Sequence, residues 1–206
     1  MKQFNGYDEA KKAAQYTSTK LPEGAYICEI LEVKYINSDD SSKNDVIEIL
    51  FDIADGEQKG FFKTQYANSS DENRRWKGRT RIYVPLDDGS DKDNITKKSF
   101  AKWTDSLEQS NLGYIWDWRE AMWKGKKVGI VFGTTGTVID GKEVTYTEAR
   151  FPIATDLVKN GKAPKAKFKA KNGYVGDNAP SPSAPAVTGD EPWMQVGDDP
   201  EGLPFV

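Results

Sequence analysis

Val46-Ile47-Glu48-Ile49-Leu50-Phe51-Asp52-Ile53 is the stretch that decides the fold. Apolar and acidic side chains alternate along it, which is typical of a β-strand with one buried face. The face predicted to be buried carries Ile47, Ile49, Phe51 and Ile53, and the opposite face carries Glu48 and Asp52. We therefore expect this strand to lie in a sheet that covers the core.

Similar patterns flank this strand on both sides. Residues 25–36 alternate in the same way and predict the preceding strand. Asp55-Gly56 is a hairpin signal, so residues 59–66 are predicted to return as a partner strand. Further strands are predicted over residues 79–85, 128–132 and 143–151, the last two joined by a second hairpin at Asp140-Gly141.

One helix interrupts the predicted strands. Residues 94–109 have helical spacing, with Phe100, Trp103 and Leu107 on one stripe. A small antiparallel sheet with a helix before its last strands favours a closed barrel, because closure hides the strand edges. The prediction is a mainly β fold: an antiparallel barrel of five to six strands, like the oligonucleotide-binding (OB) barrel, with one inserted helix.

Four segments are expected along the chain. Residues 1–20 form an N-terminal arm with a short helix over 7–16, and residues 21–158 form the OB-like domain. Residues 159–197 are a linker, first rich in lysine and then in proline, glycine and serine. Because residues 172–206 contain too little apolar surface to offset the entropy of ordering, the C-terminal tail is predicted to be disordered. Residues 198–206 are a separate acidic tip.

The composition narrows the classes of function. The 206 residues include one cysteine and no histidine, which removes the commonest general base and metal ligand. We therefore expect no enzyme activity, no catalytic residue, no metal and no cofactor. No apolar run is long enough to span a bilayer, and residues 1–6 contain no apolar run typical of a secretory signal. The expected location is the cytoplasm, with no membrane contact.

The charge is divided unevenly. The net charge is −3, but residues 172–206 hold six acids and no lysine or arginine. The remaining chain has 29 basic and 26 acidic residues, a net charge of +3. A basic body with an anionic tail favours a polyanionic ligand.

Aromatic and cationic residues alternate in one region. Single-stranded nucleic acids are bound by cations along the phosphates and by aromatic faces against the bases. Trp76, which has basic residues on both sides, is the strongest candidate for a base contact. The candidate DNA-binding residues are Phe61, Lys63, Tyr66, Arg74, Arg75, Trp76, Lys77, Arg79, Arg81, Lys124, Lys126 and Lys127.

The same residues have an alternative interpretation. In a regular strand about half of these aromatic side chains point into the core, and the arginines could simply solvate a surface. A second aromatic group is expected to form core or an oligomer interface, and it consists of Trp103, Trp116, Trp118 and Trp123.

The C-terminal tip carries a short motif. Leu203-Pro204-Phe205 follows the acids Asp198, Asp199 and Glu201. This ending resembles the tip of bacterial and phage single-stranded DNA-binding proteins, although Val206 follows here where that family usually ends on Phe. The resemblance implies a non-catalytic, phage-type protein that coats single-stranded DNA in replication, recombination or repair. If the chain is phage-encoded, this would take place in the cytoplasm of a bacterial host.

The resemblance also implies partners. The three acids would meet the cations of a basic pocket, and Leu203, Pro204 and Phe205 would fill it. The pocket would belong to a helicase, polymerase, primase or recombinase, and the protein would form homo-oligomers. Two other classes remain open: a protein-binding adaptor or inhibitor that binds no nucleic acid, and a metal-dependent nuclease built on acidic residues.

Overall fold

The computed structural model describes residues 20–40, 42–69, 72 and 74–176. The predicted N-terminal helix and the acidic tip lie outside the described residues.

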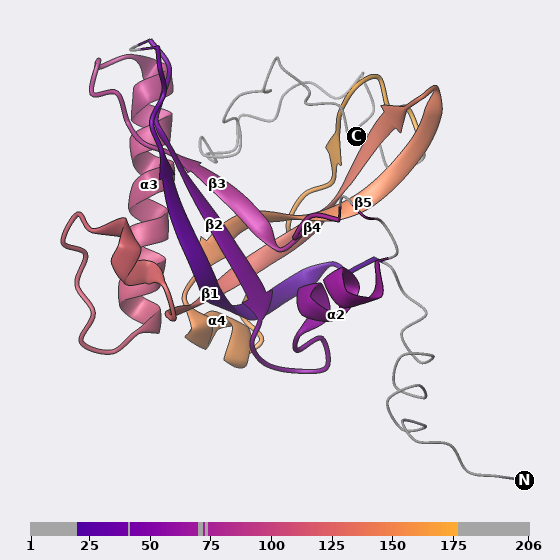
Figure 1. The fold of residues 1–206 in the computed structure, drawn as a ribbon, viewed down its shortest axis with the longest axis horizontal. Helices are drawn as coiled ribbons and strands as arrows, with labels where there is room; N and C mark the ends of the chain where they lie inside the picture. Colours follow the sequence, from indigo (N-terminus) through magenta and orange to yellow (C-terminus); the bar gives the residue numbers. More distant parts are fainter. Residues whose placement is uncertain (1–19, 41, 70–71, 73, 177–206) are drawn as a thin grey trace, which may run out of the picture.

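One sheet organises this part of the chain (Figure 1). Strands β1 (Gly24–Ile36), β2 (Val46–Ile53) and β3 (Arg79–Tyr83) form an antiparallel meander. Strand β4 (Lys127–Ile139) pairs with the other edge of β1, and β5 (Lys142–Ile153) pairs with β4. The fourth strand thus lies beside the first, which is the order of a Greek key.

The sheet is open and mixed. Its strand order is β3-β2-β1-β4-β5, and no ladder joins β3 to β5 among the described residues. The short strand β6 (Lys169–Ala170) pairs with β4 in parallel. The prediction of a mainly β fold with five to six strands is confirmed, whereas closure into an antiparallel barrel is not.

The core lies where the pattern in residues 46–53 predicted it. Ile47, Ile49, Phe51 and Ile53 are each no more than 2% exposed. Helix α3 (Asp91–Ser110) buries the predicted stripe of Phe100, Trp103 and Leu107. Ser90 precedes it, and its hydroxyl accepts from the Asp93 N–H at 3.1 Å, which satisfies a free donor of the first turn. The inserted helix is confirmed.

The first predicted hairpin is wrong, because residues 61–68 form helix α2 (Phe61–Asn68) and not a strand. The cause is Asp52 on β2, whose carboxylate accepts from the N–H groups of Phe62 at 3.0 Å and Lys63 at 3.1 Å. These are donors that the first turn of a helix leaves unpaired. A helix can also bury both Phe61 and Phe62, which a strand would place on opposite faces.

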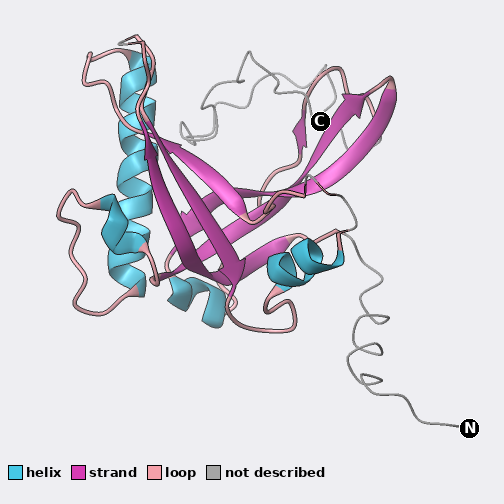
Figure 2. Cartoon of the chain, viewed as in Figure 1, coloured by secondary structure: helices cyan, strands magenta, loops and turns pink. Residues whose placement is uncertain are grey.

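The second predicted hairpin is confirmed. Asp140 and Gly141 join β4 to β5 with φ angles of 50° and 72°, as a type I′ turn requires. The 3₁₀ turn η1 (Glu120–Trp123) precedes β4. Figure 2 shows the helices at the periphery of the sheet, with α3 along one side of it.

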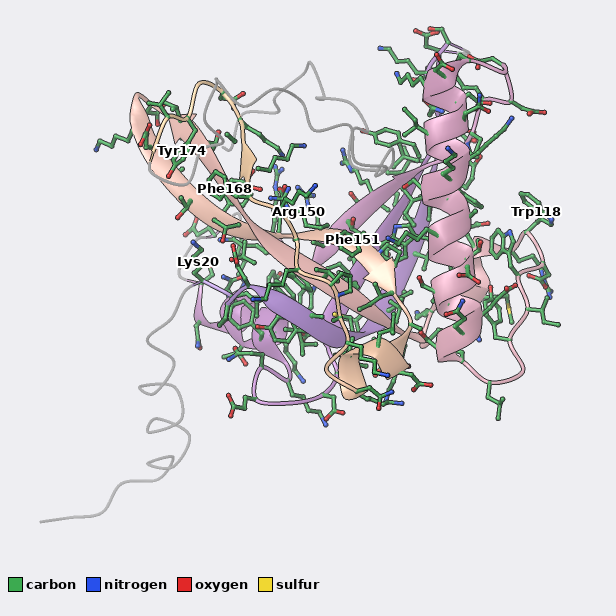
Figure 3. All side chains as sticks on the ribbon, turned by 180° about the vertical axis from the view of Figure 1, so that it is seen from behind. Lys20, Trp118, Arg150, Phe151, Phe168 and Tyr174 are labelled. Carbon is green, nitrogen blue, oxygen red and sulfur yellow. The ribbon has the colours of Figure 1, made fainter. Side chains whose placement is uncertain are left out.

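The packed body continues beyond residue 158, where the linker was expected to begin. After helix α4 (Thr155–Lys159), the chain returns over β4 and forms β6. A Cβ on Gly136 would lie 2.7 Å from the rings of Phe168 and Tyr174, so the close approach needs glycine. Figure 3 shows both rings beside the β4–β5 hairpin. Residues 159–176 therefore belong to the folded body.

Candidate nucleic-acid interface

An open depression of about 350 Å³ lies on the outer face of the β1–β2 pair. Tyr66 of α2 and two residues of the chain between α2 and β3 complete its wall. Its lining is Leu31, Glu32, Leu50, Tyr66, Arg74 and Trp76. We call it the Trp76 depression.

Two leucines give the depression an apolar floor. The pairing of β1 with β2 skips one residue between Ile30 and Glu32, so Leu31 occupies a β-bulge and is 39% exposed. Leu50 lies on β2 between the buried residues Ile49 and Phe51 and therefore points to the opposite face. Apolar side chains at these two positions offer a surface on which a flat ring can rest.

The ring of Trp76 is held in one orientation. Its Nε1–H donates to the carbonyl oxygens of Phe51 at 3.0 Å and Gly78 at 3.1 Å. One part of the ring packs against the core, and the side chain is half-buried. The rest of the ring lines the depression. A face fixed in this way loses little entropy when a second ring stacks on it.

Tyr66 and Arg74 extend this aromatic surface. The Tyr66 and Trp76 ring centroids are 5.9 Å apart, and the Arg74 Cζ lies 4.7 Å from the Tyr66 centroid. The latter distance is that of a cation–π contact. The Arg74 Nη1 also donates to the Ser69 carbonyl oxygen at 3.4 Å. A cation is thereby placed at the rim of the two rings.

A strip of further cations runs from the depression along β3. Arg79 is paired with Leu50 in the sheet, and Arg81 follows two residues later on the same face. Both approach Glu48, with Nη1 of Arg79 at 4.0 Å and Nε of Arg81 at 3.1 Å from Oε2. The two side chains stay 43% and 41% exposed, so each has N–H groups facing solvent. Lys63, Arg75 and Lys77 are also exposed.

One predicted contact needs correction, and a second predicted residue is already in contact with an aromatic ring. Phe61 is only 4% exposed because α2 turns it into the core, so its ring offers no face to a base. The Nζ of Lys126 lies over the Tyr114 ring, 4.0 Å from its centroid. The backbone of Lys126 runs beside the bulge, since its carbonyl accepts from the Ile30 N–H at 2.9 Å. Lys124 and Lys127, which flank Lys126 in the chain, are exposed.

Leu31, Glu32 and Leu50 are the lining residues that the sequence interpretation missed. Leu50 could have been found, because it is an apolar residue on the face that otherwise carries Glu48 and Asp52. Leu31 and Glu32 could not, because the bulge that exposes Leu31 shifts the register of pairing by one residue.

Arg150 is the centre of a second polar cluster, which holds the fold together. Its guanidinium donates to Glu148 at 2.7 Å and to the Thr134 carbonyl at 2.7 Å. Lys171 lies 3.6 Å from the other oxygen of Glu148 and ties the segment after β6 to β5. Burial lowers the pKa of Arg150. The positive charge of Arg150 is engaged by groups of the fold itself. This cluster is therefore not part of the candidate interface.

The second aromatic group is divided between core and surface. Trp103 and Trp123 are buried, as expected of core residues, whereas Trp118 is 80% exposed. It stacks on Phe100 at 6.5 Å and has a φ of 63°. Leu112, Ile115 and Met122 are exposed in the same segment, at 108%, 77% and 46%. We call residues 111–122 the apolar loop; Figure 3 places Trp118 at the opposite end of the molecule from Phe168 and Tyr174.

In the part of the chain that the structure describes, no three His, Cys, Asp or Glu residues come close enough to hold a metal ion. Among the helices so described, none is long and apolar enough to cross a membrane.

No model of a known protein family matches this chain, and no curated protein is significantly similar to it in sequence.

Proposed function

We propose that this protein binds single-stranded DNA without catalysing a reaction and coats it during replication, recombination or repair. The Trp76 depression carries the proposal. It combines an immobilised aromatic face, a second ring, an arginine at the rim and an apolar floor. Stacking platforms beside cations are what single-strand binding requires, because every base has a face to stack and every nucleotide has a phosphate.

The strand order supports this function. An OB barrel is a partly open Greek-key barrel that binds oligonucleotides across its second and third strands. We propose that β1–β5 are an opened form of that barrel, with α3 inserted between the third and fourth strands. The depression and the arginines of β3 would then lie on the face with which OB barrels bind oligonucleotides.

A path for the DNA follows from the charges. A base would rest in the depression, and the backbone would run along β3 past Arg79 and Arg81. Both arginines approach Glu48, which lowers the repulsion of a phosphate by that carboxylate. Lys63, Arg75 and Lys77 would hold the neighbouring phosphates.

The acidic tip is proposed to recruit partners. Asp198, Asp199 and Glu201 would meet the cations of a helicase, polymerase, primase or recombinase, and Leu203-Pro204-Phe205 would fill an apolar pocket there. This part of the proposal rests on the resemblance of the tip alone, and a cytoplasmic location goes with it.

The proposed function predicts salt-dependent binding to single strands. We expect labelled oligo-dT to bind, with a matched duplex much weaker, in anisotropy titrations that contain EDTA. If the five cations along the proposed DNA path each contact one phosphate, log affinity should fall by about 3.5 per log unit of salt. Folded protein that ignores oligo-dT at low salt would contradict the proposal and favour a protein-binding adaptor. Cleavage of DNA on adding magnesium would favour a nuclease.

A second copy of the chain is proposed as the partner of the apolar loop. A bulky residue at positive φ, such as Trp118, is strained, and such strain persists mainly at functional positions. One tryptophan buries about 150–250 Å². With Leu112, Ile115 and Met122, two loops meeting face to face would bury roughly 1,000 Å², the lower limit of a specific interface.

This proposal predicts a dimer that depends on Trp118. Sedimentation velocity should show a dimer of the full chain at micromolar concentration and a monomer for Trp118→Asn with Ile115→Ser. Asparagine suits the φ of 63° at this position, so the loop keeps its backbone conformation. Lys98→Ala, exposed on α3, is the control and should leave the dimer intact. A monomeric wild type at tens of micromolar would contradict the proposal.

A further inference from the structure

Glu32 stands out among the residues that line the Trp76 depression. It is exposed at the bulge of β1, and within the described residues its carboxylate has no hydrogen-bond or ion-pair partner. Two other acids on this face are engaged: Glu48 lies beside Arg79 and Arg81, and Asp52 accepts from the first turn of α2. Glu32 therefore brings an uncompensated negative charge to the place where a base would stack.

A free carboxylate opposes the binding of a polyanion unless the ligand offers it donors. The Watson–Crick edges of unstacked bases are such ligands. Guanine presents two adjacent donors, its N1–H and its N2 amino group, which match the two oxygens of a carboxylate. Cytosine and adenine present one amino group beside a ring acceptor. Thymine presents one N–H between two carbonyl oxygens, which repel a carboxylate.

We propose that the Trp76 depression is a base-selective subsite that takes guanine. The base would rest on Leu31 and Leu50 against the Trp76 ring, with its N1–H and N2 amino group donating to Glu32. Arg74 at the rim would then take the adjacent phosphate. The inference rests on the proposed function, because it assigns the base at the stacking site of the same interface. It adds a preference for guanine at one position to a protein that otherwise binds single strands of any sequence.

The charges agree with this assignment. Arg74 is a donor held beside Tyr66, and Glu32 is an acceptor on the other wall, so the depression offers both signs within one site. Its volume of about 350 Å³ has room for a purine, and its open side lets the base enter from a single strand. A phosphate group in the depression would lie near the carboxylate of Glu32, and the two negative charges would repel each other.

Three twelve-nucleotide strands test the subsite: oligo-dT, alternating dT-dG and alternating dT-dI. Inosine keeps the N1–H of guanine and lacks only its N2 amino group. Lithium salt in the titration buffer prevents the guanines from pairing among themselves. We expect wild type to bind dT-dG about tenfold more tightly than dT-dI, in the range of a bidentate base contact, and to bind oligo-dT most weakly.

Glu32→Gln should reduce the dT-dG to dT-dI affinity ratio to about one. Removing the acid should also tighten binding to oligo-dT, which gains no favourable contact from Glu32, so the ratio is the diagnostic quantity. Glu29→Gln is the matched control on β1, because Glu29 lies opposite Asp52 and does not line the depression. It should leave the ratio unchanged.

The outcomes separate the two proposals. Equal binding of dT-dG and dT-dI by wild type, or an unchanged ratio in Glu32→Gln with an unchanged unfolding temperature, would overturn the subsite alone. No binding of any strand by folded protein would overturn the proposed function and the subsite with it.

Discussion

Trp76→Ala is expected to weaken the binding of single-stranded DNA about ten- to a hundredfold, within the 1–3 kcal/mol that one stacked base contributes. The physical reason is that the Trp76 ring is already immobilised by two hydrogen bonds from Nε1, so it stacks without a further loss of freedom. Anisotropy of a labelled alternating dT-dG strand measures the loss without relying on tryptophan emission. An affinity within twofold of wild type would remove Trp76 from the interface.

Trp76 also packs on the core, so its replacement costs stability as well. Tyr66→Ala and Arg74→Ala test the same depression through exposed side chains, and each is expected to weaken binding about three- to tenfold with little change in unfolding temperature. Lys98→Ala removes an exposed cation on α3 and is the matched control for Arg74→Ala. If Lys98→Ala weakened binding as much as Arg74→Ala, the loss of affinity would reflect the net charge of the protein and not a contact in the Trp76 depression.

Gly78→Ala is expected to lower the free energy of unfolding by about 3 kcal/mol, at the upper end of overpacking costs. A Cβ at this position would lie 2.3 Å from the Phe51 carbonyl oxygen and 2.7 Å from the Phe62 ring. The first of these atoms belongs to the backbone of β2, which cannot rotate away as a side chain can. Urea unfolding followed by circular dichroism measures the difference.

The same substitution should disturb the candidate interface. The Gly78 carbonyl accepts from the Phe51 N–H at 2.7 Å and from the Trp76 Nε1–H at 3.1 Å, so moving this backbone also moves the Trp76 ring. Lys77→Ala, one residue away and exposed, is the control for stability and should unfold like wild type. A Gly78→Ala protein as stable as wild type would show that β2 and α2 can separate at low cost.

The elements predicted well from sequence are those whose signal is local. Residues 46–53 alternate so regularly that only one face can be buried, and β2 buries that face. The Asp140-Gly141 turn is fixed by two residues that tolerate positive φ. The stripe of Phe100, Trp103 and Leu107 specifies which side of α3 meets the core. Each of these predictions needed no knowledge of distant residues.

Helix α2 shows where local patterns stop being sufficient. Residues 59–66 alternate as a strand would, yet the carboxylate of Asp52 accepts from the N–H groups of the first turn of a helix. The hydrogen bonds join residues ten and eleven positions apart in the chain. Phe61, which was predicted to stack on a base, is buried for this reason.

The sequence by itself determined strands β1 to β5, the inserted helix and the choice of Trp76 as the central residue of the candidate site, because periodicity and composition are properties of neighbouring residues. Tertiary structure alone decided the depression around it. Leu31 is exposed by a bulge in the pairing of β1 with β2, and Trp76 is oriented by a carbonyl 25 residues away in the chain. Such contacts depend on which backbone atoms approach one another after folding, and no pattern of neighbouring residues specifies that.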